Sequence, residues 1–271
     1  LFRMETSKHW AEQYTGETAM DDFEPVGEGG NYPETGFEEG FPKAIVNETW
    51  KSQFAITQEL VEDGRISTMK KRANKLITSY DRTREKFGRY LYAGGLYGTS
   101  VKVGAKTFDC ASADKQPLFS KSHPNKVDKK AQSNLFDGEL TADNLGRLEE
   151  KMQKLKGDTG ELLSITPNNM WIPNDAQLKR QAFAAAGSDK DPESSNNAFN
   201  YQVGRWNILV DPYLTWVLQL MGKTDKPWFL LDGAFLEEND GAIFQDRVKL
   251  NVRSVLDENN DNNLWKGRAR F

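Results

Sequence analysis

The hydrophobic pattern is clearest between residues 66 and 93. Apolar side chains recur there at spacings of three and four, at Ile66, Met69, Ala73, Leu76, Ile77, Tyr80, Phe87 and Leu91. This period places them on one face of an α-helix, and the pair Gly94 and Gly95 is expected to end it. The pattern predicts a helix over 67–93, about 40 Å long at 1.5 Å per residue, whose apolar stripe belongs to a protein core.

A different pattern precedes this helix. Residues 43–61 are rich in β-branched and aromatic side chains and partly alternate, which favours strands over a helix. We expect a long two-stranded hairpin here. Because an isolated two-stranded ribbon is only marginally stable in water, it must pack on its own body or reach another molecule.

The first forty residues show no sustained apolar period and contain six glycines and two prolines. This composition predicts an irregular or extended arm, with one short helix around Ser7–Tyr14.

Shorter elements follow the long helix. Thr141 is a candidate N-cap for a helix to about Lys156, and a further helix is expected from Asp175 to Gly187. Strand-like apolar runs cover 162–165, 170–172, 206–220 and 227–231, and the last two runs, 243–256 and 264–271, are expected to pair as a hairpin. The mixture predicts an α+β fold.

Composition narrows the class of protein. The chain has 271 residues, of which 37% are hydrophobic and 28% charged, as in a globular protein of one large or two modest domains. No apolar run is long enough to span a bilayer, so no membrane partner is expected. Cys110 is the single cysteine, which excludes an internal disulfide and a cysteine-built zinc site. Because the chain begins with Leu1, we expect that it lacks an original N-terminal piece.

Charge is divided unevenly along the chain. The net charge is −4, but residues 1–48 hold eleven acids against three bases, a net of −8, while residues 65–93 hold nine bases against two acids, a net of +7. Such runs are often simply solvated faces. The alternative is complementarity, in which the acidic arm lies on basic surface of its own body or of a neighbour.

Residues that could carry chemistry are few. The two histidines, His9 and His123, do not form a zinc motif, Cys110 has no protease context, and the glycines near residue 29 lack the following helix and lysine of a phosphate site. Seven tryptophans could line a sugar site, although most lie in apolar runs typical of a core or an interface. No catalytic residue, cofactor or metal ligand is predicted.

The order of elements and several local stretches resemble a known family. The stretches are PLFSKSHPNK at 117–126, QSN at 132–134, LTADNL at 140–145, GELLSITPNNMWIPNDAQLKRQAF at 160–183, WNILVDPYLTW at 206–216 and GFEEGFPKAIVNETWKSQFAITQELVEDG at 36–64. They are similar to Mu-like major head proteins, which are tailed-phage major capsid proteins of the Hong Kong 97 fold type.

The resemblance implies an order of domains. It makes 1–35 the N-terminal arm, 36–64 the extended loop hairpin, 65–134 the peripheral domain with its spine helix 67–93, 135–240 the axial domain and 241–271 the return strands of the peripheral domain. It further implies a structural subunit, not an enzyme, that self-assembles into pentamers and hexamers of an icosahedral phage head enclosing double-stranded DNA. The virion, assembled in the host cytoplasm, would add a portal, a scaffold or protease, and decoration proteins as partners.

Candidate contact residues follow from this implied layout. The aromatic residues Phe37, Phe41, Trp50 and Phe54 are expected at contacts between subunits. The basic residues Lys70, Lys71, Lys75 and Arg82 are expected to pair with acidic arms, or, as the less favoured alternative, to face packaged DNA without sequence preference. Some relatives join subunits through a Lys–Asn isopeptide bond; Lys43 and Lys51 are conceivable donors, but a solvated lysine is the simpler interpretation.

Two other functions remain open at this stage. An encapsulin-type nanocompartment shares the implied fold and would enclose a cargo enzyme instead of DNA. A carbohydrate-active enzyme would use the tryptophans and carboxylates, and would behave as a monomer with saturable sugar binding.

Overall fold

The computed structural model describes residues 2–18, 23–34, 36, 39–127, 129–189, 199–238 and 241–271. Contacts divide the chain into two compact units: unit 1 contains Thr15–Lys43 and Arg89–Gly241, and unit 2 contains Phe2–Tyr14, Ala44–Gly88 and Ala242–Phe271. Both helices and strands are present in the described residues, which confirms the α+β class.

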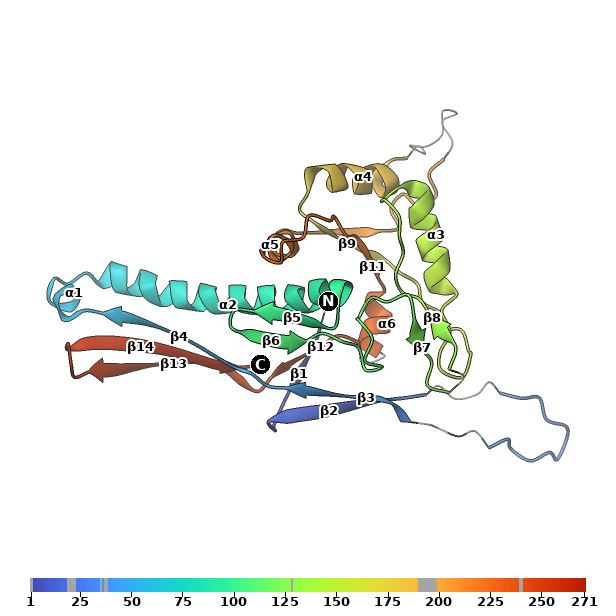
Figure 1. Ribbon diagram of the computed structural model, residues 1–271, viewed down its shortest axis with the longest axis horizontal. Helices are drawn as coiled ribbons and strands as arrows, with labels where there is room; N and C mark the ends of the chain where they lie inside the picture. Colours follow the sequence, from blue (N-terminus) through green and yellow to red (C-terminus); the bar gives the residue numbers. More distant parts are fainter. Residues whose placement is uncertain are drawn as a thin grey trace. The chain divides into compact units, whose positions relative to one another are not determined.

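Unit 2 is built on a three-stranded antiparallel sheet. Its order is β13 (Val248–Asp257), β14 (Asn262–Arg270) and β4 (Thr49–Ile56). The predicted C-terminal hairpin is therefore confirmed as β13–β14. The short helix α1 (Gln58–Glu62), capped by the hydroxyl of Thr57, follows β4, and the first part of α2 (Ile66–Tyr97) lies alongside the sheet (Figure 1).

Aromatic rings fill the space between this sheet and α2. Trp50 of β4 stacks on Phe271 with ring centroids 5.0 Å apart and meets Phe87 of α2 edge-on at 5.3 Å. Strand β1 (Arg3–Thr6) pairs in parallel with β12 (Ile243–Asp246), and a Cβ atom on Gly88 of α2 would lie 2.7 Å from the ring of Phe2. Glycine at position 88 therefore lets the N-terminal segment approach the helix.

The predicted long helix is confirmed, but it continues past its expected end. Gly94 and Gly95 lie inside α2, which continues to Tyr97. Other segments of the chain pack closely against the two glycines. A Cβ atom on Gly94 would lie 2.7 Å from Cβ of Val101, and one on Gly95 would lie 2.5 Å from Cβ of Leu118. These glycines permit close packing on the helix and do not cap it.

The strands predicted in 43–61 exist, but the hairpin between them is wrong. Strand β3 (Glu39–Val46) pairs with β2 (Ala11–Glu17), whereas β4 pairs with β14. Only Asn47 and Glu48 separate β3 from β4. The Asn47 N–H donates to the carbonyl of Trp10, and Glu48 exchanges two backbone hydrogen bonds with Phe271. The chain therefore does not fold back at Asn47 and Glu48, and β3 and β4 belong to different sheets.

The short helix expected at Ser7–Tyr14 is also wrong. The carboxylate of Glu12 accepts hydrogen bonds from the N–H groups of Lys8 and His9, and β2 begins at Ala11. These backbone hydrogen bonds hold the pKa of Glu12 below its usual value. A local turn followed by strand pairing replaces the helix.

Unit 1 contains a second sheet and most of the helices. The sheet order is β10 (Asn207–Asp211), β9 (Asn169–Pro173) and β11 (Phe229–Leu231), with β10 parallel and β11 antiparallel to β9. Helices α3 (Ala142–Gln153), α4 (Ala176–Gly187), α5 (Pro212–Leu220) and α6 (Gly233–Glu238) accompany it (Figure 1). Its buried core includes Leu145, Met170, Ile172, Leu178 and Ala182.

Two of the predicted helices in unit 1 are confirmed together with their caps. The hydroxyl of Thr141 accepts from the N–H of Asn144, and the carboxylate of Asp175 accepts from the N–H groups of Gln177 and Leu178. The strand expected at 162–165 is only an isolated bridge between Lys156 and Leu162. The run 206–220 changes from β10 to α5 at Asp211, which caps the helix ahead of Pro212.

Two small antiparallel pairs complete the described strands of unit 1. They are β5 (Ser100–Val103) with β6 (Lys106–Asp109), and β7 (His123–Pro124) with β8 (Ala131–Gln132). The domain boundary predicted between residues 240 and 241 lies one residue from the point where unit 1 ends, at Gly241. The boundary predicted between residues 134 and 135 lies inside unit 1. The peripheral and axial assignments remain predictions.

Candidate assembly surfaces

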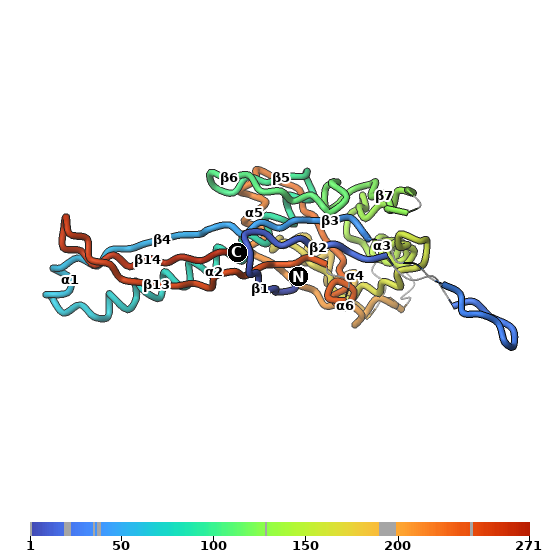
Figure 2. Tube along the Cα trace, turned by 90° about the horizontal axis from the view of Figure 1, so that it is seen from below, coloured from blue at the N-terminus to red at the C-terminus, as the bar shows by residue number. Residues whose placement is uncertain are grey.

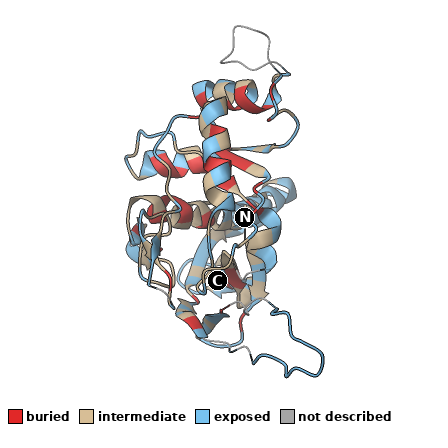
Figure 3. Ribbon diagram, turned by 90° about the vertical axis from the view of Figure 1, so that its right-hand side faces the viewer, coloured by how far each residue is buried: buried red, intermediate tan, exposed pale blue. Residues whose placement is uncertain are grey.

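The segment between β2 and β3, residues 18–38, is named here the acidic loop. It holds six acids and no lysine or arginine. Within its described part, Phe23 and Tyr32 are 103% and 95% exposed, and a Cβ atom on Gly27 or Gly29 would meet no described atom within 4 Å. Figure 2 shows this stretch as an open loop beyond β2 and β3, and Figure 3 colours it as exposed. Exposed aromatic rings on such a loop indicate a partner surface.

The base of the loop is attached firmly to unit 1. Strands β2 and β3, named here the ribbon, approach so closely that a Cβ atom on Gly40 would lie 2.8 Å from the carbonyl oxygen of Gly16. The Lys126 ammonium donates to the carbonyls of Glu39 and Gly40, and Lys43 forms an ion pair with Asp109. The loop therefore extends from a fixed support.

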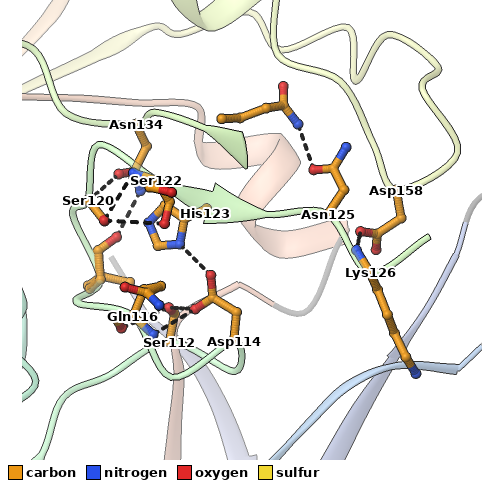
Figure 4. Close-up of polar contacts among 12 residues, drawn as sticks. Ser112, Asp114, Gln116, Ser120, Ser122, His123, Asn125, Lys126, Asn134 and Asp158 are labelled. Atoms are coloured by element: carbon orange, nitrogen blue, oxygen red, sulfur yellow. Dashed lines mark hydrogen bonds and ion pairs between the residues drawn. The ribbon is translucent and has the colours of Figure 1, made fainter. Parts of the chain in front are cut away.

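Lys126 is itself positioned by a network of hydrogen bonds (Figure 4). Its N–H donates to Asp158 Oδ1 at 2.6 Å, and the side-chain amide of Asn125 donates to the carbonyl of Gly157 at 3.0 Å. Gln132 Nε2 donates to Asn125 Oδ1 at 2.8 Å. These bonds tie the β7–β8 turn to residues 156–158.

A second part of this network surrounds Asp114. Its carboxylate accepts from the Ser112 hydroxyl and from the Gln116 N–H at 3.0 Å, and it lies 2.8 Å from Nδ1 of His123 (Figure 4). Burial alone would raise the pKa of Asp114, but these hydrogen bonds together hold the pKa below its usual value. The arrangement stabilises a loop around an ionised carboxylate.

The sheet of unit 2 gathers basic residues that are distant in sequence. Trp50 and Gly267 mark the side that faces α2, because Trp50 packs on Phe87 and a Cβ atom on Gly267 would contact Leu76. Since side chains alternate across a strand, the opposite side, named here the outer sheet face, carries three central cross-strand rows and continues to the pairs Thr49–Arg270 and Asp257–Asn262. The rows are Lys51, Arg268 and Asn251; Gln53, Lys266 and Arg253; and Ala55, Leu264 and Val255.

The match to a family model decides what these surfaces belong to. A model of phage capsid proteins matches residues 42–271. The chain belongs to the phage capsid protein family. It is a structural subunit of an icosahedral phage head, located in the virion, and it is not an enzyme. The carbohydrate-active alternative is therefore wrong, and the match favours a phage head over a cellular nanocompartment.

Solved structures show the same fold for this capsid protein. Over 99% of the chain, it is similar to the capsid of Ralstonia phage GP4, with 9% identity, 81% coverage of that chain and a TM-score of 0.54. A structure from Mycobacterium phage Adephagia matches with 9% identity, 80% coverage of that chain and a TM-score of 0.53 over 99% of this one. One from Microbacterium phage Oxtober96 matches with 10% identity, 81% coverage and a TM-score of 0.51, again over 99%. The Hong Kong 97 type of fold is thereby confirmed. No curated protein matches the sequence.

The predicted aromatic contact residues have different surroundings in the capsid protein. Phe37 lies outside the described residues, and Phe41 is half-buried on β3. Trp50 belongs to the aromatic core of unit 2, and Phe54 stacks on Trp265 with centroids 6.2 Å apart. Trp50 and Phe54 thus have packing partners within their own chain, and their role at subunit contacts remains a prediction.

The basic residues of α2 separate into two groups. Lys70, Lys71, Lys75 and Arg82 are exposed, and none forms an ion pair with another described residue. Other cations are used inside the chain: Arg72 donates to the carbonyl of Ala55 at 2.8 Å, and Arg84 and Arg89 pair at 2.7 Å with Asp246 and Asp211.

The outer sheet face was not predicted from the sequence. In the sequence its cations are four separate positions, Lys51, Arg253, Lys266 and Arg268, and the expected pairing of β4 with β3 did not bring them together. Only the observed register, Lys51 opposite Arg268 and Lys266 opposite Arg253, brings the cations together.

Other chemistry finds no support in the described part of the chain. No group of three or more His, Cys, Asp or Glu residues there is placed to hold a metal ion, and none of the helices there is both long and apolar enough to cross a bilayer. Burial, followed by the charge of Asp109, raises the pKa of the Cys110 thiol to about 11. The thiol therefore stays protonated at neutral pH and is a poor nucleophile.

Proposed function

We propose that this capsid protein assembles into pentamers and hexamers that close around double-stranded DNA, with the acidic loop of each copy lying on a neighbouring copy. The observation that carries the proposal is the full exposure of Phe23 and Tyr32 on a loop whose base is fixed. Such a loop gains burial only from another molecule. Each contact can be weak, because a closed shell makes many contacts at once.

We propose the following domain roles. Helix α2 is the spine of a peripheral domain to which β13 and β14 return, and residues 135–240 form the axial domain. The extended loop was predicted over 36–64. Since β4 lies within the unit 2 sheet, we propose that the projecting part is the ribbon with residues 18–38, and that the N-terminal arm is the segment before β2.

The exposed cations Lys70, Lys71, Lys75 and Arg82 keep two candidate partners, the acidic N-terminal region (residues 1–35) of a copy of this chain or packaged DNA. The portal, the scaffold or protease, and decoration proteins also remain predictions. The ion pair with Asp109 accounts for the position of the Lys43 side chain without an isopeptide bond. Denaturing electrophoresis tests this, since a linked shell requires bands above the 30.7 kDa of a single chain.

The experiment that tests the proposal removes the acidic loop. Replacing residues 19–37 by a short Gly-Ser linker is feasible because Gly16 and Gly40 already lie in contact. We expect the shortened chain to fold, with unchanged helical circular dichroism, but to form no closed particles in negative-stain electron microscopy. The matched control is the pair Glu258→Ser and Asn259→Ser in the β13–β14 turn, which should assemble. Normal particles without the loop would contradict the proposal.

A further inference from the structure

Unit 1 contains a cavity of about 420 Å³. It lies between Leu96 near the end of α2, residues 133–138, helix α3 and residues 225–236, and all of these belong to the same unit. Its volume falls within the range of small-molecule sites, about 300–1,000 Å³, and is far larger than one water molecule needs. The cavity therefore has room for a small organic ligand.

Most of the cavity wall is apolar. Large, half-buried apolar side chains face the cavity from several segments, among them Phe119, Phe136, Met152, Leu155, Trp228 and Leu236. The ring of Phe136 meets that of Trp228 edge-on with centroids 6.2 Å apart, and Trp228 Nε1 donates to the carbonyl of Gly138 at 3.0 Å. These contacts fix the wall before a ligand enters. An apolar ligand then removes the wall from water, which is favourable.

One cation in the wall has only neutral partners among the described residues. The Lys151 ammonium donates to the carbonyl of Leu135 at 2.6 Å and to the hydroxyl of Ser133 at 3.2 Å, and Lys151 is half-buried. An ammonium has three donors, so one remains for an acceptor inside the cavity. Because hydrogen bonds between two ionised groups are the strongest, the site favours a ligand with a negative charge.

The other charged side chains of the wall are already accommodated. Lys226 pairs with Asp175 at 3.2 Å, and Asp232 accepts hydrogen bonds from two backbone N–H groups. Asp225 is exposed, so water and salt screen its charge. Lys151 is therefore the cation of the described wall that is placed to bind an anion.

We propose that the cavity binds a small carboxylate with an apolar body, of the class of a medium-chain fatty acid. Its carboxylate accepts a hydrogen bond from Lys151, and its hydrocarbon chain lies along the apolar wall. A purely apolar molecule leaves the third donor of Lys151 without an anion, and a small inorganic anion leaves the wall in contact with water. Every residue involved lies within one unit of a single copy, so binding does not require assembly.

Isothermal titration calorimetry of the full-length, unassembled subunit with decanoate tests the site. We expect saturable binding of one molecule per chain, with an affinity that rises about fourfold for each methylene added from hexanoate to decanoate. Lys151→Met should weaken the binding of decanoate about tenfold but leave that of decanol, which has no charge, unchanged. Lys151→Arg should keep most of the affinity for decanoate. The matched control Lys154→Met, on the exposed side of the same helix, should keep all of it.

Filling the cavity and assembling the shell give two further measurements. Leu155→Trp should abolish the binding of both ligands, with unchanged helical circular dichroism as the check that the chain folds, and assembled particles should bind decanoate as the subunit does. Absence of saturable binding to the subunit, or equal losses for decanol and decanoate in Lys151→Met, would overturn the proposal. Loss of binding on assembly would show that a neighbouring copy fills the cavity, and would overturn it as well.

Discussion

At the scale of single residues, Asp211 connects three parts of unit 1 through one carboxylate. It accepts from Arg89 Nε at 2.7 Å and from Trp171 Nε1 at 3.1 Å, and its other oxygen caps α5. The side chains of Asp211 and Arg89 are only 7% and 18% exposed. The sequence showed Asp211 merely as a polar residue inside an apolar run.

Asp211→Ala is expected to lower the free energy of unfolding of the unassembled subunit by about 3 kcal/mol, because it leaves the largely buried Arg89 without this partner. Urea denaturation measures the effect. The control is Asp143→Ala, which removes an exposed ion pair with Arg147 and should cost less than about 1 kcal/mol. Equal losses in the two variants would contradict the central position given to Asp211.

Gly95 gives a second test at this scale. Alanine normally stabilises a helix relative to glycine by about 1 kcal/mol, but a Cβ atom here would lie 2.5 Å from Cβ of Leu118. Gly95→Ala should therefore destabilise the subunit, by about 1–3 kcal/mol, as a fall in the midpoint of thermal unfolding. Gly98→Ala is the matched control, because no described atom lies within 4 Å of its added carbon, and it should be nearly neutral. A stabilised Gly95→Ala would show that the glycine is not required by packing.

At the scale of elements, local patterns predicted the helices better than the strand partners. The 3.6-residue stripe of α2 and the caps Thr141 and Asp175 are encoded within a few residues, so the sequence reveals them directly. The partner of β4 lies about 210 residues further along the chain, and alternation alone cannot identify it. The outer sheet face depends on that pairing, which explains why its basic residues appeared unrelated in the sequence.

The ribbon is the element whose support can be tested separately. Lys126→Ala removes the ammonium group that binds the carbonyls of Glu39 and Gly40. We expect faster amide hydrogen exchange in the first half of β3 and faster proteolysis in the acidic loop, with little change in α3 or β9. Lys154→Ala, which loses only an exposed ion pair with Glu150, should leave both rates unchanged. Unchanged exchange in Lys126→Ala would contradict the anchoring role.

At the scale of the whole molecule, the distribution of charge gains a consistent explanation. In the isolated chain the aromatic rings of the acidic loop stay exposed, and the exposed cations Lys70, Lys71, Lys75 and Arg82 of α2 form no ion pair with a described residue. In a shell of identical copies, every acidic loop can lie on a neighbouring copy. The net charge of −4 is the sum of −8 in residues 1–48 and +4 in residues 49–271, so these regions of opposite charge can attract one another between copies.

Electron cryomicroscopy of particles formed by the full chain tests this account most directly. It predicts closed shells in which residues 18–38 of one copy lie on a neighbouring copy. Single folded chains, or shells in which the loop packs against its own copy, would contradict it.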